Sequence, residues 1–85
     1  MERMFDEHSF QEEITKPSEA KACYDYFVSN LTAFRQSLAE EGLSYEEINE
    51  VVKTCWLNLA KSCARVGWTN PHINRMVQLY TQKEK

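Results

Sequence analysis

The sequence predicts an all-α fold: an antiparallel helical hairpin plus a shorter C-terminal third helix in a small helical bundle, with an N-terminal arm that is partly helical or disordered. Three observations predict this fold. Apolar residues recur every three or four positions along most of the chain, as they do on one face of a helix. Glycine and proline occur only twice each, always at a break between such stretches. The alternation of apolar and polar residues that marks strands is nearly absent.

Composition places the chain among small globular proteins. Its 85 residues, 42% of them hydrophobic, suffice for one domain with a modest core. We expect a cytoplasmic protein without a membrane anchor. The acidic N-terminus lacks the apolar run of a signal peptide, and no stretch approaches the roughly 18 apolar residues of a membrane span.

Charge is unevenly distributed along the chain. Residues 1–50 carry twelve acidic and four basic side chains, whereas residues 51–85 carry one acidic and six basic side chains. The net charge of −3 argues against a general nucleic-acid binder. The basic second half leaves room for a local basic patch.

The first predicted helix covers about residues 18–41 and opens a single three-helix domain at residues 17–82. Pro17 suits a first helical turn, and Gly42 supplies the left-handed residue that ends a helix. One stripe of apolar side chains runs along this helix: Ala20, Tyr24, Phe27, Leu31, Phe34 and Leu38.

The second predicted helix covers about residues 45–66. Ser44 is a favoured N-cap, and Glu47 stands three residues later, as in the reciprocal capping box. Leu43 can pack against both Leu38 and Ile48 and so close the turn between the two helices. The apolar face of this helix consists of Ile48, Val52, Cys55, Leu59, Cys63 and Val66.

The two apolar faces match when the helices fold back about Leu43. Facing positions in an antiparallel hairpin have a constant sum of residue numbers. Five pairs share the sum of 86: Leu38 with Ile48, Phe34 with Val52, Leu31 with Cys55, Phe27 with Leu59, and Ala20 with Val66. This register predicts an antiparallel hairpin with layer-by-layer contact.

The third predicted helix covers about residues 71–82. Gly67 ends the second helix and lets Trp68 fold back over Cys63. Asn70 can cap the third helix, with Pro71 at its first position. Its apolar face consists of Ile73, Met76, Val77 and Tyr80. Residues 83–85 are expected to fray.

The acidic N-terminal arm, residues 1–16, has no defined course in the sequence. It contains three apolar residues that can form an amphipathic segment, Phe5, Phe10 and Ile14. Ser9 and Glu12 repeat the capping-box spacing.

The sequence carries no catalytic, metal-binding or cofactor-binding signature. We therefore expect a protein that is not an enzyme and has no small-molecule substrate. His8 and His72 are isolated, and Cys-x-x-Cys or His-x-x-x-His pairs are absent. Cys23 and Cys63 also share the sum of 86 and could form a disulfide. We favour the alternative, in which the cysteines are small apolar residues in a reducing cytosol.

Five glutamates crowd the predicted hairpin tip: Glu40, Glu41, Glu46, Glu47 and Glu50. The helix dipole favours acidic residues in a first turn, which explains Glu46 and Glu47 in part. Because five acids exceed what capping needs, we expect an acidic surface that recruits a basic protein partner.

The third helix, about 18 Å long, is too short to cover a hairpin of about 35 Å. We therefore expect the tip half of the core to lack a lid, with Val51, Trp56 and Leu57 available to a partner. A second copy could cover it, because an antiparallel homodimer would set each acidic tip against the other copy's basic residues, Lys61, Arg65 and Arg75. The sequence thus predicts a small regulatory or adaptor protein that acts by protein–protein binding through an incompletely covered hairpin.

An alternative function follows from residues 63–77, CARVGWTNPHINRMV, which resemble the helix-turn-helix motif of bacterial repressors. The small residue of that motif falls at Cys63, its glycine at Gly67, and Arg75 stands where arginine is common. The resemblance implies a DNA-binding regulator whose second helix lies in the major groove. It implies base contacts from Thr69, Asn70, Asn74, Arg75 and Gln78, and phosphate contacts from Lys61 and Arg65.

Overall fold

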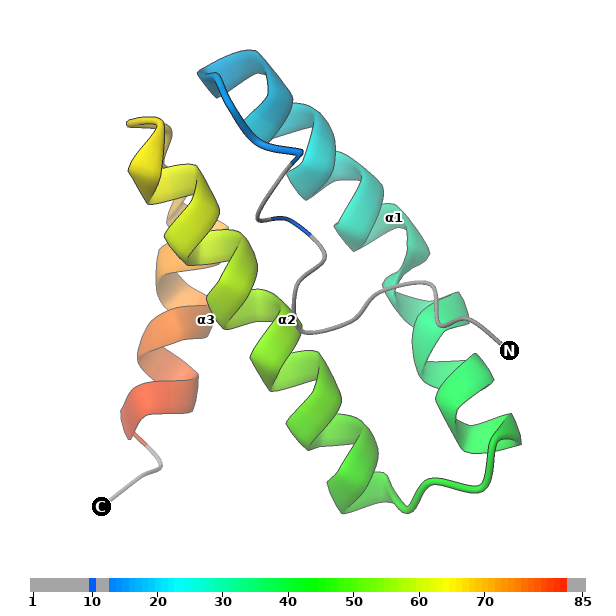
Figure 1. Ribbon diagram of the computed structural model, residues 1–85. Helices are drawn as coiled ribbons and strands as arrows, with labels where there is room; N and C mark the ends of the chain where they lie inside the picture. Colours follow the sequence, from blue (N-terminus) through cyan, green and yellow to red (C-terminus); the bar gives the residue numbers. More distant parts are fainter. Residues whose placement is uncertain (1–9, 11–12, 83–85) are drawn as a thin grey trace.

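The computed structural model describes Phe10 and residues 13–82, and this part of the chain contains three α-helices (Figure 1). They are α1 (Pro17–Glu40), α2 (Tyr45–Arg65) and α3 (Pro71–Gln82). The residues so described contain no strand. The predicted all-α fold, a helical hairpin with a shorter third helix, is confirmed. The predictions for Phe5, His8, the Ser9–Glu12 pair and the tail at 83–85 lie outside the described residues.

The turn between α1 and α2 has the local interactions that the sequence predicts. Gly42 has a φ of +98°, in the left-handed region that favours glycine. The Leu43 N–H donates to the Leu38 carbonyl over 3.2 Å. Ser44 Oγ accepts from the Glu47 N–H at 3.2 Å, and the Glu47 carboxylate accepts from the Ser44 N–H at 2.8 Å. This capping box starts α2 directly after the turn and holds the tip in one geometry.

The corner between α2 and α3 also follows the prediction. Gly67 has a φ of +79°, and the Trp68 N–H donates back to the Cys63 carbonyl over 3.0 Å. Asn70 Oδ1 accepts from the His72 N–H at 2.8 Å. The side chain of Asn70 therefore caps α3, with Pro71 as the first helical residue.

The core lies between α1 and α2 and is closed on both faces. On one face α3 packs against α2, and on the other lie Phe10 and the segment that leads from residue 13 into α1 (Figure 1). Phe10 and Ile14 of the arm are only 2% and 0% exposed. The Phe10 ring meets Phe27 edge-on with 5.7 Å between centroids, and Arg65 donates to the Ile14 carbonyl over 3.0 Å. These two arm residues are thus part of the core.

The expectation that the tip half of the hairpin lacks a lid is wrong. Phe34, Leu38 and Val52 are at most 1% exposed, and Ile48 is 7% exposed. The expectation rested on the third helix and the arm, which both start at the open end of the hairpin, whereas the half-buried side chains of Leu43, Val51 and Tyr80 also pack against this core. None of the helices in the described ranges is long and apolar enough to cross a membrane.

Candidate functional site

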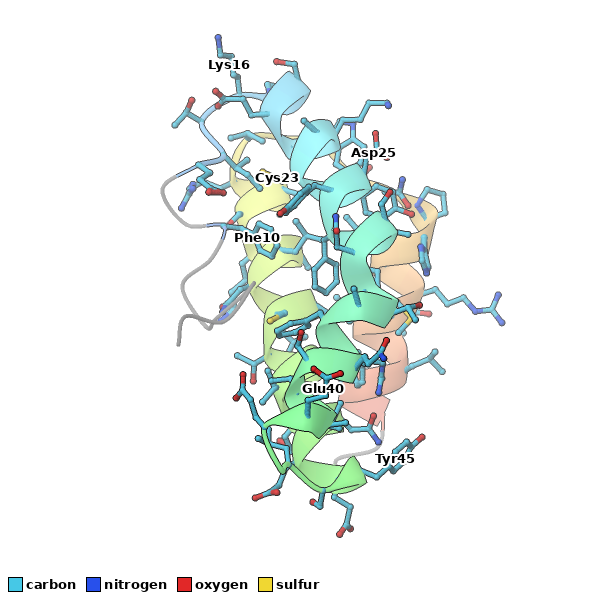
Figure 2. All side chains as sticks on the ribbon, turned by 90° about the vertical axis from the view of Figure 1, so that its right-hand side faces the viewer. Phe10, Lys16, Cys23, Asp25, Glu40 and Tyr45 are labelled. Atoms are coloured by element: carbon cyan, nitrogen blue, oxygen red, sulfur yellow. The ribbon has the colours of Figure 1, made fainter. Side chains whose placement is uncertain are left out.

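The hairpin tip presents an acidic surface that includes one exposed tyrosine. Tyr45, the first residue of α2, is 74% exposed, and Figure 2 shows its side chain projecting from the tip, with Glu40 on the last turn of α1. The predicted acidic residues are all exposed there: Glu40, Glu41, Glu46, Glu47 and Glu50. We call these five residues and Tyr45 the acidic tip.

The local hydrogen bonds explain only part of this acidity. Glu47 is used in the capping box of α2. Among the residues that the structure describes, Glu40, Glu46 and Glu50 form no ion pair. Their carboxylates face solvent, where unpaired charges can attract a basic surface over roughly 8–10 Å at physiological salt.

Trp56 is not available to a partner, which corrects the sequence prediction. Its side chain is 1% exposed and lies between Phe27 of α1 and His72 of α3, with ring centroids 5.0 and 5.1 Å away. Trp56 lies off the main stripe of α2 on the side where α3 packs, and α3 covers it. The predicted register places Phe27 opposite Leu59. The long indole of Trp56, about one turn before Leu59 on α2, reaches the same Phe27 ring.

Val51 and Leu57 are half-buried. Val51 packs against the core from the edge of α2 and keeps part of its side chain at the surface. Leu57 does not belong to the residues packed on that core and keeps part of its side chain at the surface. Of the three apolar residues predicted for partner binding, Leu57 fits the prediction best.

The outer face of α3 carries a second candidate surface. Five exposed residues of α3 line a shallow, open surface hollow of about 440 Å³: Pro71, Asn74, Arg75, Gln78 and Leu79. We call this feature the α3 hollow. It brings together three residues of the predicted DNA-reading set, Asn74, Arg75 and Gln78. Two apolar side chains and three polar ones give it the mixed character of a binding surface.

The other residues of the predicted DNA-reading set fall into two groups, those that are exposed and those whose side chains make contacts within the chain. Lys61 and Thr69 are exposed. Asn70 uses its side chain to cap α3, and Arg65 donates to the carbonyl of Ile14. Asn70 and Arg65 therefore have structural contacts within the chain.

A hydrogen-bonded aromatic cluster sets the position of α3 and therefore of the hollow. The Tyr24 hydroxyl of α1 and His72 Nδ1 of α3 lie 2.7 Å apart. The Tyr24 ring also lies 5.8 Å from that of Trp68, in the loop between α2 and α3. The Tyr24 and His72 rings also pack edge-on, with 5.9 Å between centroids, so aromatic packing and a hydrogen bond together help to hold α3 against the hairpin.

Sequence reasoning missed Tyr45 and Leu79 as surface residues. Leu79 is 48% exposed, and helical spacing gives a signal for it, because it falls outside the predicted apolar face of α3. Tyr45 also had a signal, because it directly follows the N-cap and lies outside the predicted apolar face of α2.

The three cysteines are free thiols, with Cys55 and Cys63 buried. Burial, and then the nearby Cys23, raise the pKa of the Cys63 thiol from 9.0 to about 11. Burial, followed by the charges of Glu13 and Glu19, raises the pKa of Cys23. Both thiols are therefore protonated at neutral pH and are weak nucleophiles.

The described surface thus includes an acidic tip and a neutral-to-basic α3 face. Residues 51–82 contain four basic and no acidic side chains. Such surfaces suit binding through charge and shape. Comparison with known proteins finds no matching family model, no matching curated protein and no matching solved structure.

Proposed function

We propose that the chain is a small cytoplasmic regulatory or adaptor protein that is not an enzyme and acts by binding a protein partner through its acidic tip. The observation that supports this proposal is the exposure of Tyr45, at 74%, among five exposed glutamates. A large aromatic side chain left in water at a charged tip has no role in the core of this chain. Tyrosine is enriched among the residues that contribute most to protein interfaces.

The tip combines two kinds of interaction that an interface uses. The Tyr45 ring can enter an apolar pocket while its hydroxyl keeps a hydrogen bond. The surrounding carboxylates steer a basic surface toward it and disfavour acidic competitors. The partner that fits this tip is a protein with a basic surface around an apolar pocket.

The tip is held rigidly before a partner arrives. The capping box between Ser44 and Glu47 and the left-handed Gly42 define the turn. Buried Leu38 and Ile48 anchor it on either side. A surface that is already ordered loses less conformational entropy on binding.

The experiment is affinity capture from the source cell with the full chain immobilised. The test variant is Glu46→Gln/Glu50→Gln, which removes two charges from the tip. Its matched control is Glu13→Gln/Asp25→Asn, which removes two charges from exposed positions elsewhere. We expect one protein to be retained by the wild type and by the control, and to be lost with the tip variant.

Two results would reject the proposal. In the first, the tip variant retains every protein that the wild type retains. In the second, the wild type retains nothing above the background of an unrelated immobilised protein. A third immobilised variant, Tyr45→Ser, separates the aromatic contribution from the charge, because it leaves all five carboxylates in place.

A second candidate function is DNA binding through α3. The observation that favours it is the α3 hollow, in which Asn74, Arg75 and Gln78 stand together at the surface. Asparagine and glutamine can pair with adenine, and arginine with guanine, from the major groove. The absence of acidic residues from positions 51–82 removes local repulsion of phosphates.

The DNA candidate is tested by fluorescence anisotropy with mixed-sequence duplex DNA at low salt. A DNA reader gives salt-sensitive binding that Arg75→Ala abolishes and that Lys21→Ala, on the exposed surface of α1, leaves intact. If the duplex is not bound at the lowest salt, the DNA candidate is excluded and the protein-binding proposal is unaffected.

A further inference from the structure

The acidic tip and the α3 hollow differ in shape. Figure 2 shows Tyr45 projecting from the tip toward the side on which α3 lies. The hollow opens on the exposed residues of α3, with Pro71 and Leu79 as its apolar lining and Asn74, Arg75 and Gln78 as its polar lining. One surface therefore projects a tyrosine, and the other is hollowed.

The two surfaces also differ in charge. Five exposed glutamates share the hairpin tip with Tyr45. The hollow holds the cation of Arg75, and no acidic residue occurs on α3 or on α2 after Glu50. A carboxylate that approaches α3 from outside therefore meets an arginine and no local repulsion, which makes the two surfaces of one chain complementary.

We propose that two copies of the chain pair through these surfaces, with Tyr45 of each copy seated in the α3 hollow of the other. This inference rests on the proposed binding function of the tip and names a second copy as the partner. The Tyr45 ring packs against Pro71 and Leu79. The glutamates beside Tyr45 lie against Arg75.

The hydrogen-bonding groups of the two surfaces also match. The Tyr45 hydroxyl donates to an amide oxygen of Asn74 or Gln78 and accepts from an amide nitrogen of the other. The hollow is shallow and open to solvent, with a volume of about 440 Å³, so a phenol ring can lie in it with water at its edges. Water-bridged contacts are common in protein interfaces.

The pairing closes on itself. Tyr45 projects toward the side on which α3 lies (Figure 2), and in an isologous dimer one two-fold axis makes both contacts at once. Each copy then contributes one tip and one hollow, and neither surface is left to add a third copy.

The dimer forms from chains that are already folded. The core residues of the hairpin are buried within one copy, from Phe27 and Phe34 to Val52 and Leu59. The second copy therefore covers no exposed core and contributes only the surface contacts described above. The pairing is expected to depend on both concentration and salt.

The test is sedimentation velocity of the full chain from low to high micromolar concentration at low salt. The wild type should shift from 10.0 kDa to twice that mass as concentration rises, and high salt should weaken the shift. Arg75→Glu and Tyr45→Ser should remain monomeric. The matched controls, Lys21→Glu and Tyr26→Ser on α1, should dimerise like the wild type, and circular dichroism checks that every variant is helical.

A charge exchange gives the sharpest result. Arg75→Glu and Glu46→Arg/Glu50→Arg should each be monomeric alone, because each brings like charges together. Their equimolar mixture should dimerise. In the mixed dimer, one contact has the wild-type charges, and the other has arginines at the tip and glutamate at position 75. Opposite charges therefore meet in both contacts. Failure of the mixture to associate, when the wild type does, would overturn the proposed contact.

The inference is also overturned if the wild type stays at 10.0 kDa throughout, or if Tyr45→Ser and Arg75→Glu dimerise unchanged. A monomeric chain does not by itself reject the proposed function. In that case the capture experiment still shows whether the acidic tip binds a different protein, so the two failures are distinguishable.

Discussion

The hydroxyl of Tyr24 and Nδ1 of His72 lie 2.7 Å apart, and this hydrogen bond joins the first helix of the hairpin to the third helix. The same histidine packs edge-on against buried Trp56 of α2. One residue near the start of α3 thus contacts both helices of the hairpin. This contact helps to position α3 and the α3 hollow, together with buried Ile73 and the half-buried Met76, Val77 and Tyr80 on the apolar face of that helix.

Removing the hydroxyl of Tyr24 should lower stability by a small, measurable amount. Tyr24→Phe keeps the ring packing and loses the bond to His72, which is worth about 0.5–1 kcal/mol for a hydrogen bond near the surface. The free energy of unfolding from urea titration measures it. Tyr45→Phe is the control, because Tyr45 is 74% exposed at the tip. Equal stability of the two variants would show that the Tyr24 bond contributes nothing.

Truncating Trp56 should lower the free energy of unfolding far more. Trp56→Ala removes a side chain that is 1% exposed and contacts both Phe27 and His72, so we expect a loss of about 3–5 kcal/mol. Trp56→Phe keeps much of the volume and should lose less, which keeps the comparison measurable if the alanine variant unfolds. A loss below about 1 kcal/mol for Trp56→Ala would contradict the burial of this residue between the helices.

The N-terminal arm should contribute to the stability of the whole domain. Ile14 is fully buried and its carbonyl accepts a hydrogen bond from Arg65. Ile14→Ala should therefore cost about 2–4 kcal/mol in urea unfolding. Thr15→Ala, next to it on the exposed surface, is the control and should cost much less. An unchanged unfolding midpoint for Ile14→Ala would mean that the arm does not pack on the hairpin.

Much of this fold could be predicted because the signals are local. Ser44 and Glu47 are three residues apart, and Gly42, Gly67 and Asn70 act on their immediate neighbours, so the sequence alone indicates where each helix begins and ends. These interactions do not depend on the position of distant residues.

The burial of Trp56, Phe10 and Ile14 could not be predicted in the same way. Helical spacing places Trp56 off the main stripe of α2, and only the position of α3 determines that it is covered. Phe10 and Ile14 precede the first helix, and their burial depends on the groove that two later helices form. The same holds for the candidate site. The acidic tip could be predicted because its residues are close in sequence, whereas the α3 hollow depends on how α3 packs against the hairpin.

The stability of the protein should fall as the pH rises above 9. Burial raises the pKa of Cys63 from 9.0 to about 11, so the folded state keeps the proton more tightly than the unfolded state. The corresponding stability is fully present below pH 9 and is lost between pH 9 and 11. Urea unfolding across this range should show a weaker pH dependence for Cys63→Ala than for the wild type. Parallel curves for the two proteins would refute the assignment.

Substitution of the left-handed glycine at the α2–α3 corner should lower the stability of the protein. Gly67 has a φ of +79° with open space around it, so a side chain there meets no clash but strains the backbone. Gly67→Ala should cost about 1 kcal/mol, and Gly67→Asn less, because asparagine tolerates this conformation. Thermal unfolding of both variants tests the order, and a more stable alanine variant would be inconsistent with the turn geometry.

The central claim, that the acidic tip binds a protein, is tested most directly by photo-crosslinking at position 45 in the source cell. Tyr45 is replaced by the photoreactive residue benzoylphenylalanine, and the matched control carries the same residue at Tyr26, an exposed position on α1. We predict a defined adduct from position 45, with a second copy of the chain or with another protein, and little or none from position 26. No adduct at 45, or the same adducts from both positions, would contradict the claim.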